Sequence, residues 1–180
     1  MSTTATPIAS PAIGSRPSPK QQFLDAYERE HAITMRVLRA YPTDQTELRP
    51  HTLCKSAREL AWIFTLERGL GTAVLNNNLA ALTPGSTPPP PDSWDAVLGA
   101  LENAHKEYGA LVASIPDEQM HETVKFFTGP KTLGDVPRID FLWFLLCDEI
   151  HHRGQFSIYL RMAGGKVPSI YGPSRDEPWS

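Results

Sequence analysis

Residues 138–163, RIDFLWFLLCDEIHHRGQFSIYLRMA, predict one long helix against which the rest of the chain can pack. Asp135 or the Val136-Pro137 step opens this helix, and Gly164-Gly165 closes it. Asp148 and His152 lie one turn apart, so their side chains share a face. A buried carboxylate is unfavourable unless it is paired or binds a metal. These two residues interrupt a stripe that should face the core: Phe141, Leu145, Asp148, His152, Phe156 and Tyr159.

Three further segments have the helical periodicity needed to pack against this stripe. Glu30 and Thr34 interrupt the apolar face of the first, Glu67 that of the second, and His105 that of the third. Four such helices predict an all-α four-helix bundle. In chain order, the expected helices span about residues 20–40, 53–78, 93–114 and 138–163.

Proline-rich connectors separate these helices. Thr83 to Asp92, TPGSTPPPPD, favours an extended polyproline conformation that could cross the end of the bundle. Thr123 to Phe127 should form a short extended segment, followed by a turn at Thr128-Gly129-Pro130.

The two ends of the chain have little helical character. Residues 1–19 are rich in Ser, Thr, Ala and Pro and predict a disordered leader, which leaves residues 20–180 as a single domain. The segment from Gly164 to Ser180 should wrap back onto the bundle as a non-helical tail. Its apolar anchors would be Val167, Ile170, Tyr171 and Trp179.

Composition excludes several classes of protein. The net charge is −3, and the basic residues are spread along the chain, so the basic stripe of a nucleic-acid-binding protein is missing. No apolar run approaches the ~20 residues that span a bilayer, and the N-terminus lacks the apolar core of a signal peptide. Two cysteines, Cys54 and Cys147, do not make a disulfide framework, which fits a cytoplasmic protein.

The octapeptide DEIHHRGQ, residues 148–155, resembles the last helix of the DinB/YfiT-like metalloenzyme family, whose pattern is close to H-x-x-x-H-R-G-Q. Glu30 with Thr34 resembles the first helix of that family, and Arg49-Pro50 followed by residues 56–62 resembles the second. The resemblance covers about residues 20–163. It implies an up-down-down-up four-helix bundle that is often a homodimer. It also implies a divalent metal held by three histidines, with thiol-dependent transferases and amide hydrolases among the relatives.

The chain departs from this histidine pattern at two positions. Ile63 and Asp148 stand where the family has metal-binding histidines, and only His152 is kept. Glu67 lies one turn beyond Ile63, so Glu67, Asp148 and His152 are the expected metal ligands. A set of two carboxylates and one histidine resembles the facial arrangement that binds iron or manganese more than it resembles a three-histidine zinc or nickel site. We therefore expect one divalent ion, with Zn, Ni, Mn and Fe all open.

The resemblance also implies a small-molecule substrate and a low-molecular-weight thiol as co-substrate. No residue pattern for binding an organic cofactor is present. Glu30 and His151 are the candidates for proton transfer or for orienting a ligand. His151 lies on a second stripe, which should face a partner subunit or the tail. The other members of that stripe are Phe144, Cys147 and Ile158.

Two other interpretations stay open. In the first, the bundle holds no metal, and Glu67, Asp148 and His152 form a buried polar network in a structural or binding protein. In the second, the chain is a ferritin-like di-iron protein, which needs two Glu-x-x-His pairs and two further glutamates. Glu28 and His31 are expected on a solvated face. The di-iron set would be Glu102 with His105, Glu149 with His152, and Glu30 with Glu67.

Overall fold

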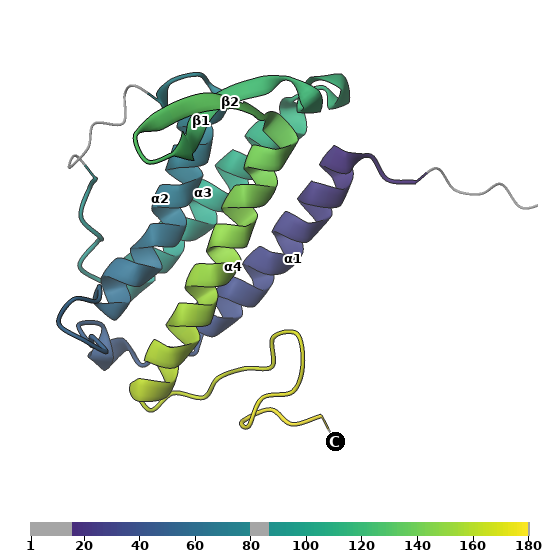
Figure 1. Cartoon of the computed structure of the whole chain (residues 1–180). Coiled ribbons are helices and arrows are strands. Elements are labelled where there is room, and N and C mark those ends of the chain that lie inside the picture. The colour runs from purple at the N-terminus through teal and green to yellow at the C-terminus, as the bar shows by residue number, and fades with distance from the viewer. Residues whose placement is uncertain (1–15, 80–86, 180) are drawn as a thin grey trace, which may run out of the picture.

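The computed structural model describes residues 16–79 and 87–179, and these residues form the expected four-helix bundle (Figure 1). Residues 1–15 of the expected leader lie outside the described residues. Its last residue, Pro19, is already the first residue of helix α1. The elements are α1 (Pro19–Arg39), η1 (Thr43–Gln45), α2 (Ala57–Leu75), α3 (Trp94–Ser114), η3 (Asp117–His121), β1 (Thr123–Gly129), β2 (Thr132–Pro137) and α4 (Arg138–Met162).

Local sequence signals set the ends of α2. Ser56 accepts a hydrogen bond from the backbone of Glu59, and the Glu59 side chain accepts one from the backbone of Ser56. This reciprocal capping box fixes the start of the helix at Ala57. The expected start at residue 53 is therefore wrong, and the Leu53 side chain is 90% exposed. At the other end, Asn77 adopts a left-handed conformation with φ 55°, and the helix stops at Leu75 instead of residue 78.

The connector after α2 lets α2 and α3 run parallel (Figure 1). Arg58 at the start of α2 donates to the carbonyl of Pro91, which places the start of α3 beside the start of α2. Residues 87–91 lie along the outer side of α2, where the Trp62 indole donates to the carbonyl of Pro88 at 2.8 Å. The described connector residues 87–91 thus lie against the side of α2 and do not cross the end of the bundle. Residues 80–86, which include part of the proline run, lie outside the described residues.

A β-hairpin covers the end of the bundle where α4 begins (Figure 1). The extended segment and the turn were expected, but the second strand, β2, was not. The turn contains Lys131 with φ 59°, a conformation that few non-glycine residues adopt. Val124 and Phe126 point inward, and the Phe126 ring packs against Phe141 with ring centroids 4.8 Å apart.

The core consists of two apolar clusters with a polar layer between them. The first cluster lies at the hairpin end and includes Phe23, Val112 and Phe141. The second lies at the opposite end and includes Phe64 and Phe156. Since all four helices cross both clusters, the middle turns of the helices form the layer between them. The buried polar residues of that layer are Glu30, Thr34, Glu67, Arg68, His105, Glu149 and Arg153.

The core face of α4 differs from the predicted stripe at its centre. Phe141, Leu145, Phe156 and Tyr159 are buried as expected, but Asp148 and His152 are only half-buried. Their neighbours in sequence point inward instead, with Glu149 1% and Arg153 2% exposed. A step of one residue along an α-helix changes the direction of the side chain by about 100° around the helix axis. Asp148 and His152 therefore lie at the edge of the α2–α4 contact, where solvent can reach them.

The tail after α4 folds back beside α1 (Figure 1). Val167 and Ile170 pack against the second cluster, as expected. Trp179 is 68% exposed, so its expected role as an anchor is wrong. Tyr171 is also largely exposed, yet its hydroxyl reaches a buried carboxylate of α1. The ion pair between Arg161 and Asp176 helps to hold the tail in place.

The second stripe of α4 stays uncovered by the tail. Its members Phe144, Cys147, His151 and Ile158 are all exposed. Of the two expected covers, the tail is therefore excluded, and a partner subunit stays a prediction. Within residues 16–79 and 87–179, no helix combines the length and the apolar character that crossing a membrane requires.

Candidate metal centre

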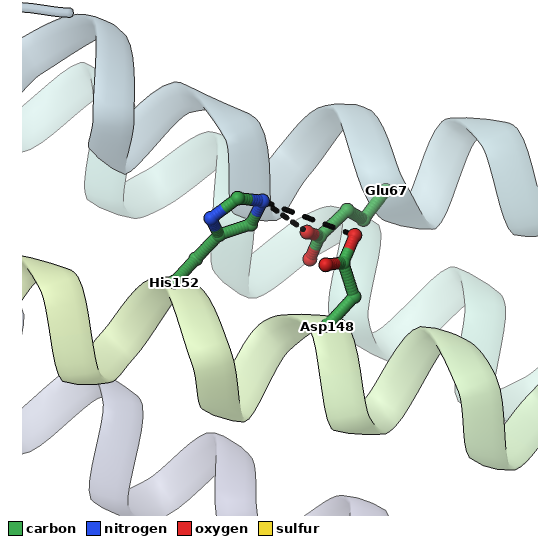
Figure 2. Close-up of side chains that lie close together, drawn as sticks. All are labelled: Glu67, Asp148 and His152. Atoms are coloured by element: carbon green, nitrogen blue, oxygen red, sulfur yellow. Dashed lines mark ion pairs between the residues drawn. The ribbon is translucent and has the colours of Figure 1, made fainter. Parts of the chain in front are cut away.

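Three side chains from α2 and α4 meet at the edge of the polar layer (Figure 2). Glu67, Asp148 and His152 each offer a ligand atom, and these atoms all lie within 4.8 Å of one another. The Nε2 atom of His152 is 3.4 Å from Oε1 of Glu67 and 3.8 Å from Oδ2 of Asp148. Across the described part of the chain, no other set of three His, Cys, Asp or Glu side chains comes as close together. The sequence prediction therefore selected residues that the fold brings together.

The Glu67 carboxyl group lacks the partners that a buried polar group needs. The residue is 7% exposed, and neither of its carboxyl oxygens has a hydrogen-bond partner in the described residues. Its nearest cation is Arg68, with Nη1 3.6 Å from Oε2. Burial raises the pKa of Glu67 to about 9; Arg68 opposes this shift, whereas Asp148 and Glu149 add to it. A cation between Glu67, Asp148 and His152 would satisfy these oxygens and reverse the effect of burial.

Gln155 orients the two adjacent histidines. Its Oε1 atom lies 3.2 Å from Nδ1 of His152, and its Nε2 atom lies 3.0 Å from Nε2 of His151. Because an amide oxygen can only accept and an amide nitrogen can only donate, these contacts assign a proton to Nδ1 of His152. Nε2 of His152 is then the unprotonated nitrogen and faces the two carboxylates, as a metal ligand requires.

A buried ion pair lies directly behind the cluster. Nη2 of Arg68 donates to Oε2 of Glu149 at 2.6 Å, and both side chains are almost completely enclosed. The Thr34 hydroxyl donates to the other oxygen of Glu149 at 2.8 Å. Since Arg68 follows Glu67 and Glu149 follows Asp148, this pair fixes the rotation of α2 and α4 on either side of the cluster.

A second buried ion pair continues the network toward the tail. Arg153 donates to Oε2 of Glu30 at 2.8 Å and to the Thr34 hydroxyl at 3.3 Å. Tyr171 of the tail hydrogen-bonds both Glu30 and Arg153. Burial disfavours the charged form of Glu30, but the hydrogen bonds from Tyr171 and Arg153 outweigh it and lower the pKa of that carboxyl. Polar contacts thus run without a break from Tyr171 to Arg68, which lies beside Glu67.

The two proton-transfer candidates have different surroundings. Glu30 belongs to the buried network around Arg153 and is not part of the three-residue cluster. Its carboxylate is held by Arg153 and Tyr171, and its role in proton transfer or in orienting a ligand stays a prediction. His151 is exposed, with its ring centroid 5.3 Å from that of His152. It lies beside the cluster and not within it.

The residues of the di-iron set do not come together. Glu149 is occupied by Arg68 and Thr34, and Glu102 forms an ion pair with Arg39 at the surface. His105 is buried as expected, with Nε2 3.1 Å from Oε2 of Glu28.

The surroundings of His31 were also predicted wrongly. It is half-buried and stacks on His105 with ring centroids 3.5 Å apart, so it does not lie on a solvated face.

Glu149, Arg153 and Arg68 are buried charged residues of the polar layer whose ion pairs the sequence analysis did not predict. A signal for two of them exists in α4. Its buried residues Leu142, Leu146, Glu149, Arg153, Phe156 and Leu160 follow one another at alternating spacings of three and four. A carboxylate and a guanidinium at positions of that series could have indicated a buried ion pair. No comparable signal distinguishes Arg68 from other helix arginines.

A groove along the outer side of α2 leads to the cluster. We call it the α2 groove; its volume is about 1100 Å³, and Glu67 and Asp148 form part of its wall. One end is lined by Arg49, Lys55 and Glu59. The apolar part of its wall is formed by Leu53, Trp62, Ile63, Leu66, Leu70 and Pro88.

Comparison with known proteins agrees with this architecture. The model of the DinB family matches residues 1–179. The YrdA protein of Bacillus subtilis strain 168 is 26% identical over 156 residues, covering 86% of this chain and 89% of that protein.

Solved structures have the same fold. A DinB-like protein from Bacillus cereus ATCC 10987 is similar with a TM-score of 0.66 and 21% identity, covering 83% of this chain and 95% of that chain. A DinB-like protein from Bacillus subtilis has a TM-score of 0.65 and 17% identity, covering 82% and 95%. At such identities, these structures support the fold alone.

Proposed function

Because the chain belongs to the DinB family, we propose that it binds one divalent metal ion through Glu67, Asp148 and His152 and uses it on a small-molecule substrate. The observation that carries the proposal is the Glu67 carboxyl group, which is buried and faces two further ligand groups. It has no hydrogen-bond partner within residues 16–79 and 87–179. The reaction class that the family resemblance favours is thiol-dependent transfer or hydrolysis.

The donor set fits a divalent ion in charge and in number. Two carboxylates and a neutral imidazole balance a charge of two, and three protein ligands leave further coordination positions free for substrate. Oxygen-rich sets with one imidazole favour manganese or iron. When bound, the ion would supply Lewis-acid chemistry at the wall of the α2 groove.

Residues around the proposed metal ligands have supporting roles. Gln155 holds the His152 ring so that Nε2 faces the carboxylates. The ion pair of Arg68 with Glu149 keeps α2 and α4 in register around the cluster. His151 is exposed beside His152 and is the residue best placed to exchange protons with solvent. The low-molecular-weight thiol remains an expectation from the resemblance.

One observation favours a second candidate, a metal-free bundle that serves as a structural or binding protein. A carboxyl group with its pKa raised to about 9 is protonated at neutral pH, so Glu67 can stay buried without a cation. The cluster would then be part of the polar layer only. The two candidates differ in whether the chain takes up metal.

The test is a competition titration of metal-free protein against a coloured chelator, with manganese, iron, nickel and zinc in turn. We expect one ion per chain. His152→Ala should weaken binding by more than the roughly 10- to 100-fold that loss of a supporting residue causes. His151→Ala is the matched control, because it removes the adjacent imidazole but no proposed ligand. Equal affinity of the wild type and His152→Ala, or no uptake at all, would favour the metal-free candidate.

Activity is tested on the metal-loaded protein with thiol-transfer and amide-hydrolysis substrates. Turnover that requires the metal and is lost in His152→Ala would support an enzyme. Turnover that survives both removal of the metal and the substitution would exclude this centre as its source.

We also propose that the chain is a homodimer that uses the exposed second stripe of α4. Phe144 and Ile158 are 52% and 59% exposed there, which leaves apolar area for a partner. Sedimentation equilibrium measures the oligomeric state. The wild type should be a dimer, and Ile158→Asp should be a monomer.

A further inference from the structure

We infer that the α2 groove binds an elongated, mostly apolar small molecule that carries an anionic group at one end. The inference deepens the proposed function. It rests on that function only for which end of the ligand would react, namely the end beside the proposed metal centre. It is carried by the lining of the groove and by the distribution of charge along it.

The wall of the groove is apolar where a ligand would lie. Ile63, Leu66 and Leu70 of α2 are half-buried and line the groove, and Ile63 and Leu70 also pack against the core clusters. They recur at spacings of three and four residues and form a continuous stripe on the outer side of the helix. A stripe of this kind on a groove wall favours a ligand with apolar surface, because burial of that surface is the main source of affinity.

Trp62 presents only its apolar surface to the groove. Its indole nitrogen already donates to the carbonyl of Pro88 at 2.8 Å, which leaves no donor on the ring for a ligand. The same hydrogen bond joins α2 to the connector, whose Pro88 and Pro90 form part of the groove lining. Trp62 and the connector therefore favour an aliphatic or aromatic body over a polar one.

Charge differs between the two parts of the groove. Glu67 and Asp148 are acidic and form the proposed metal-binding part. At the other end, Arg49 is 2.9 Å from Glu59, so their charges balance, and exposed Lys55 adds one positive charge among the described residues. An anionic group would be attracted to Lys55 and repelled by Glu67 and Asp148. This polarity orients the ligand with its anionic end away from the reacting end.

The dimensions suit a long ligand. Glu59 and Glu67 are eight residues apart on one helix, which separates them by about 12 Å along its axis. The groove volume of about 1100 Å³ is large for a small-molecule site, since such sites usually enclose roughly 300–1,000 Å³. A compact polar metabolite would fill only a small part of it.

The test uses decanoate as the probe, with acetate and decyltrimethylammonium as comparisons, and metal-free protein studied by calorimetry. Decanoate should bind with one molecule per chain, whereas acetate should not bind. Decyltrimethylammonium should bind more weakly than decanoate. The tryptophan fluorescence should change on binding, and Trp62→Phe should remove that change.

Substitutions then locate the site. Leu66→Asp should weaken decanoate by roughly tenfold or more, because it places a charge in the apolar wall. Leu53→Asp is a second variant that cannot disturb folding, since Leu53 is 90% exposed, and it should weaken decanoate in the same direction. Ile158→Asp on α4, outside the groove, is the matched control and should leave decanoate affinity unchanged. Lys55→Glu should weaken decanoate by about fivefold and not weaken decyltrimethylammonium.

The outcomes separate this inference from the proposed metal centre. Metal uptake without decanoate binding would overturn the groove inference and leave the metal centre intact. Decanoate binding that responds to Leu66→Asp, in protein that takes up no metal, would support the groove and reject the metal centre. A decanoate affinity that is unchanged in both Leu66→Asp and Leu53→Asp would also overturn the inference.

Discussion

Arg153 and Glu30 form a buried ion pair that joins α4 to α1, with Nη2 of Arg153 2.8 Å from Oε2 of Glu30 and both side chains at most 4% exposed. The pair lies in the polar layer between the two apolar clusters. Arg153 follows His152 in sequence, so the same turn of α4 presents a structural arginine to the core and a proposed metal ligand to the groove side. Stability and the proposed function can therefore be tested by substitutions at adjacent positions.

Replacing Arg153 should strongly destabilise the fold. Arg153→Met leaves the buried Glu30 carboxylate with only the exposed Arg29 as a cation, 3.4 Å away. Breaking a buried pair costs about 3–5 kcal/mol. Chemical denaturation measures the change. Arg161→Met is the control, because its ion pair with Asp176 is at the surface and should contribute about 0–1 kcal/mol. Adding Glu30→Gln to Arg153→Met should recover part of the loss; an Arg153→Met loss as small as that of Arg161→Met would contradict the account.

Tyr171 should hold the tail on the bundle. Tyr171→Phe removes only the hydroxyl that hydrogen-bonds Glu30 and Arg153, and a hydrogen bond to a charged group contributes about 1.5–3 kcal/mol. We expect a lower free energy of unfolding and faster tryptic cleavage after Lys166 and Arg175. Trp179→Phe changes an exposed aromatic residue of the same tail and should alter both quantities much less. Equal cleavage rates for the wild type and Tyr171→Phe would show that the hydroxyl does not anchor the tail.

His31 should make the protein sensitive to acid. Burial, with the nearby charge of His105, lowers the pKa of His31 from its ordinary value of 6.5 to about 3, so the folded protein holds this ring neutral. Between these values the unfolded chain binds a proton that the folded chain does not. The contribution of His31 is therefore fully present above pH 6.5 and is lost as the pH falls toward 3. His31→Gln should show a shallower loss of stability in this window, measured by denaturation at several pH values. His121→Gln, at an exposed position, is the control and should follow the wild type.

Glu67 should have the opposite effect on the metal-free protein. Because burial raises its pKa from 4.5 to about 9, the folded chain binds a proton that the unfolded chain releases. The contribution of Glu67 to the free energy of unfolding is fully present below pH 4.5 and is lost as the pH rises toward about 9. Chelator-treated wild type should therefore lose stability between pH 4.5 and about pH 9, and Glu67→Gln should remove that part of the loss. Glu107→Gln, exposed on α3, is the control. A wild-type profile identical to that of Glu67→Gln would mean that Glu67 is not held protonated.

The sequence predicted the bundle well because its signals are local. Ser18 and Ser93 cap α1 and α3, and apolar periodicity marks every helix. It also selected Glu67, Asp148 and His152, although it assigned them to the core face. That error has a physical reason: α4 is apolar on two sides, and the exposed Phe144 and Ile158 make its core face ambiguous.

Other features depend on contacts between distant segments and have little local signal. The pairing of Glu30 with Arg153 joins residues 123 positions apart. The stacking of His31 on His105 depends on how α1 packs against α3. The second strand of the hairpin, TLGDVP, has no apolar alternation that would have distinguished it from a loop.

The most direct test of the metal centre is anomalous X-ray scattering from crystals grown with manganese. The account predicts one peak per chain, located between the carboxyl oxygens of Glu67 and Asp148 and Nε2 of His152, and its loss in crystals of Glu67→Gln. A peak at another position, or no peak at millimolar manganese with the three side chains in place, would contradict the metal centre.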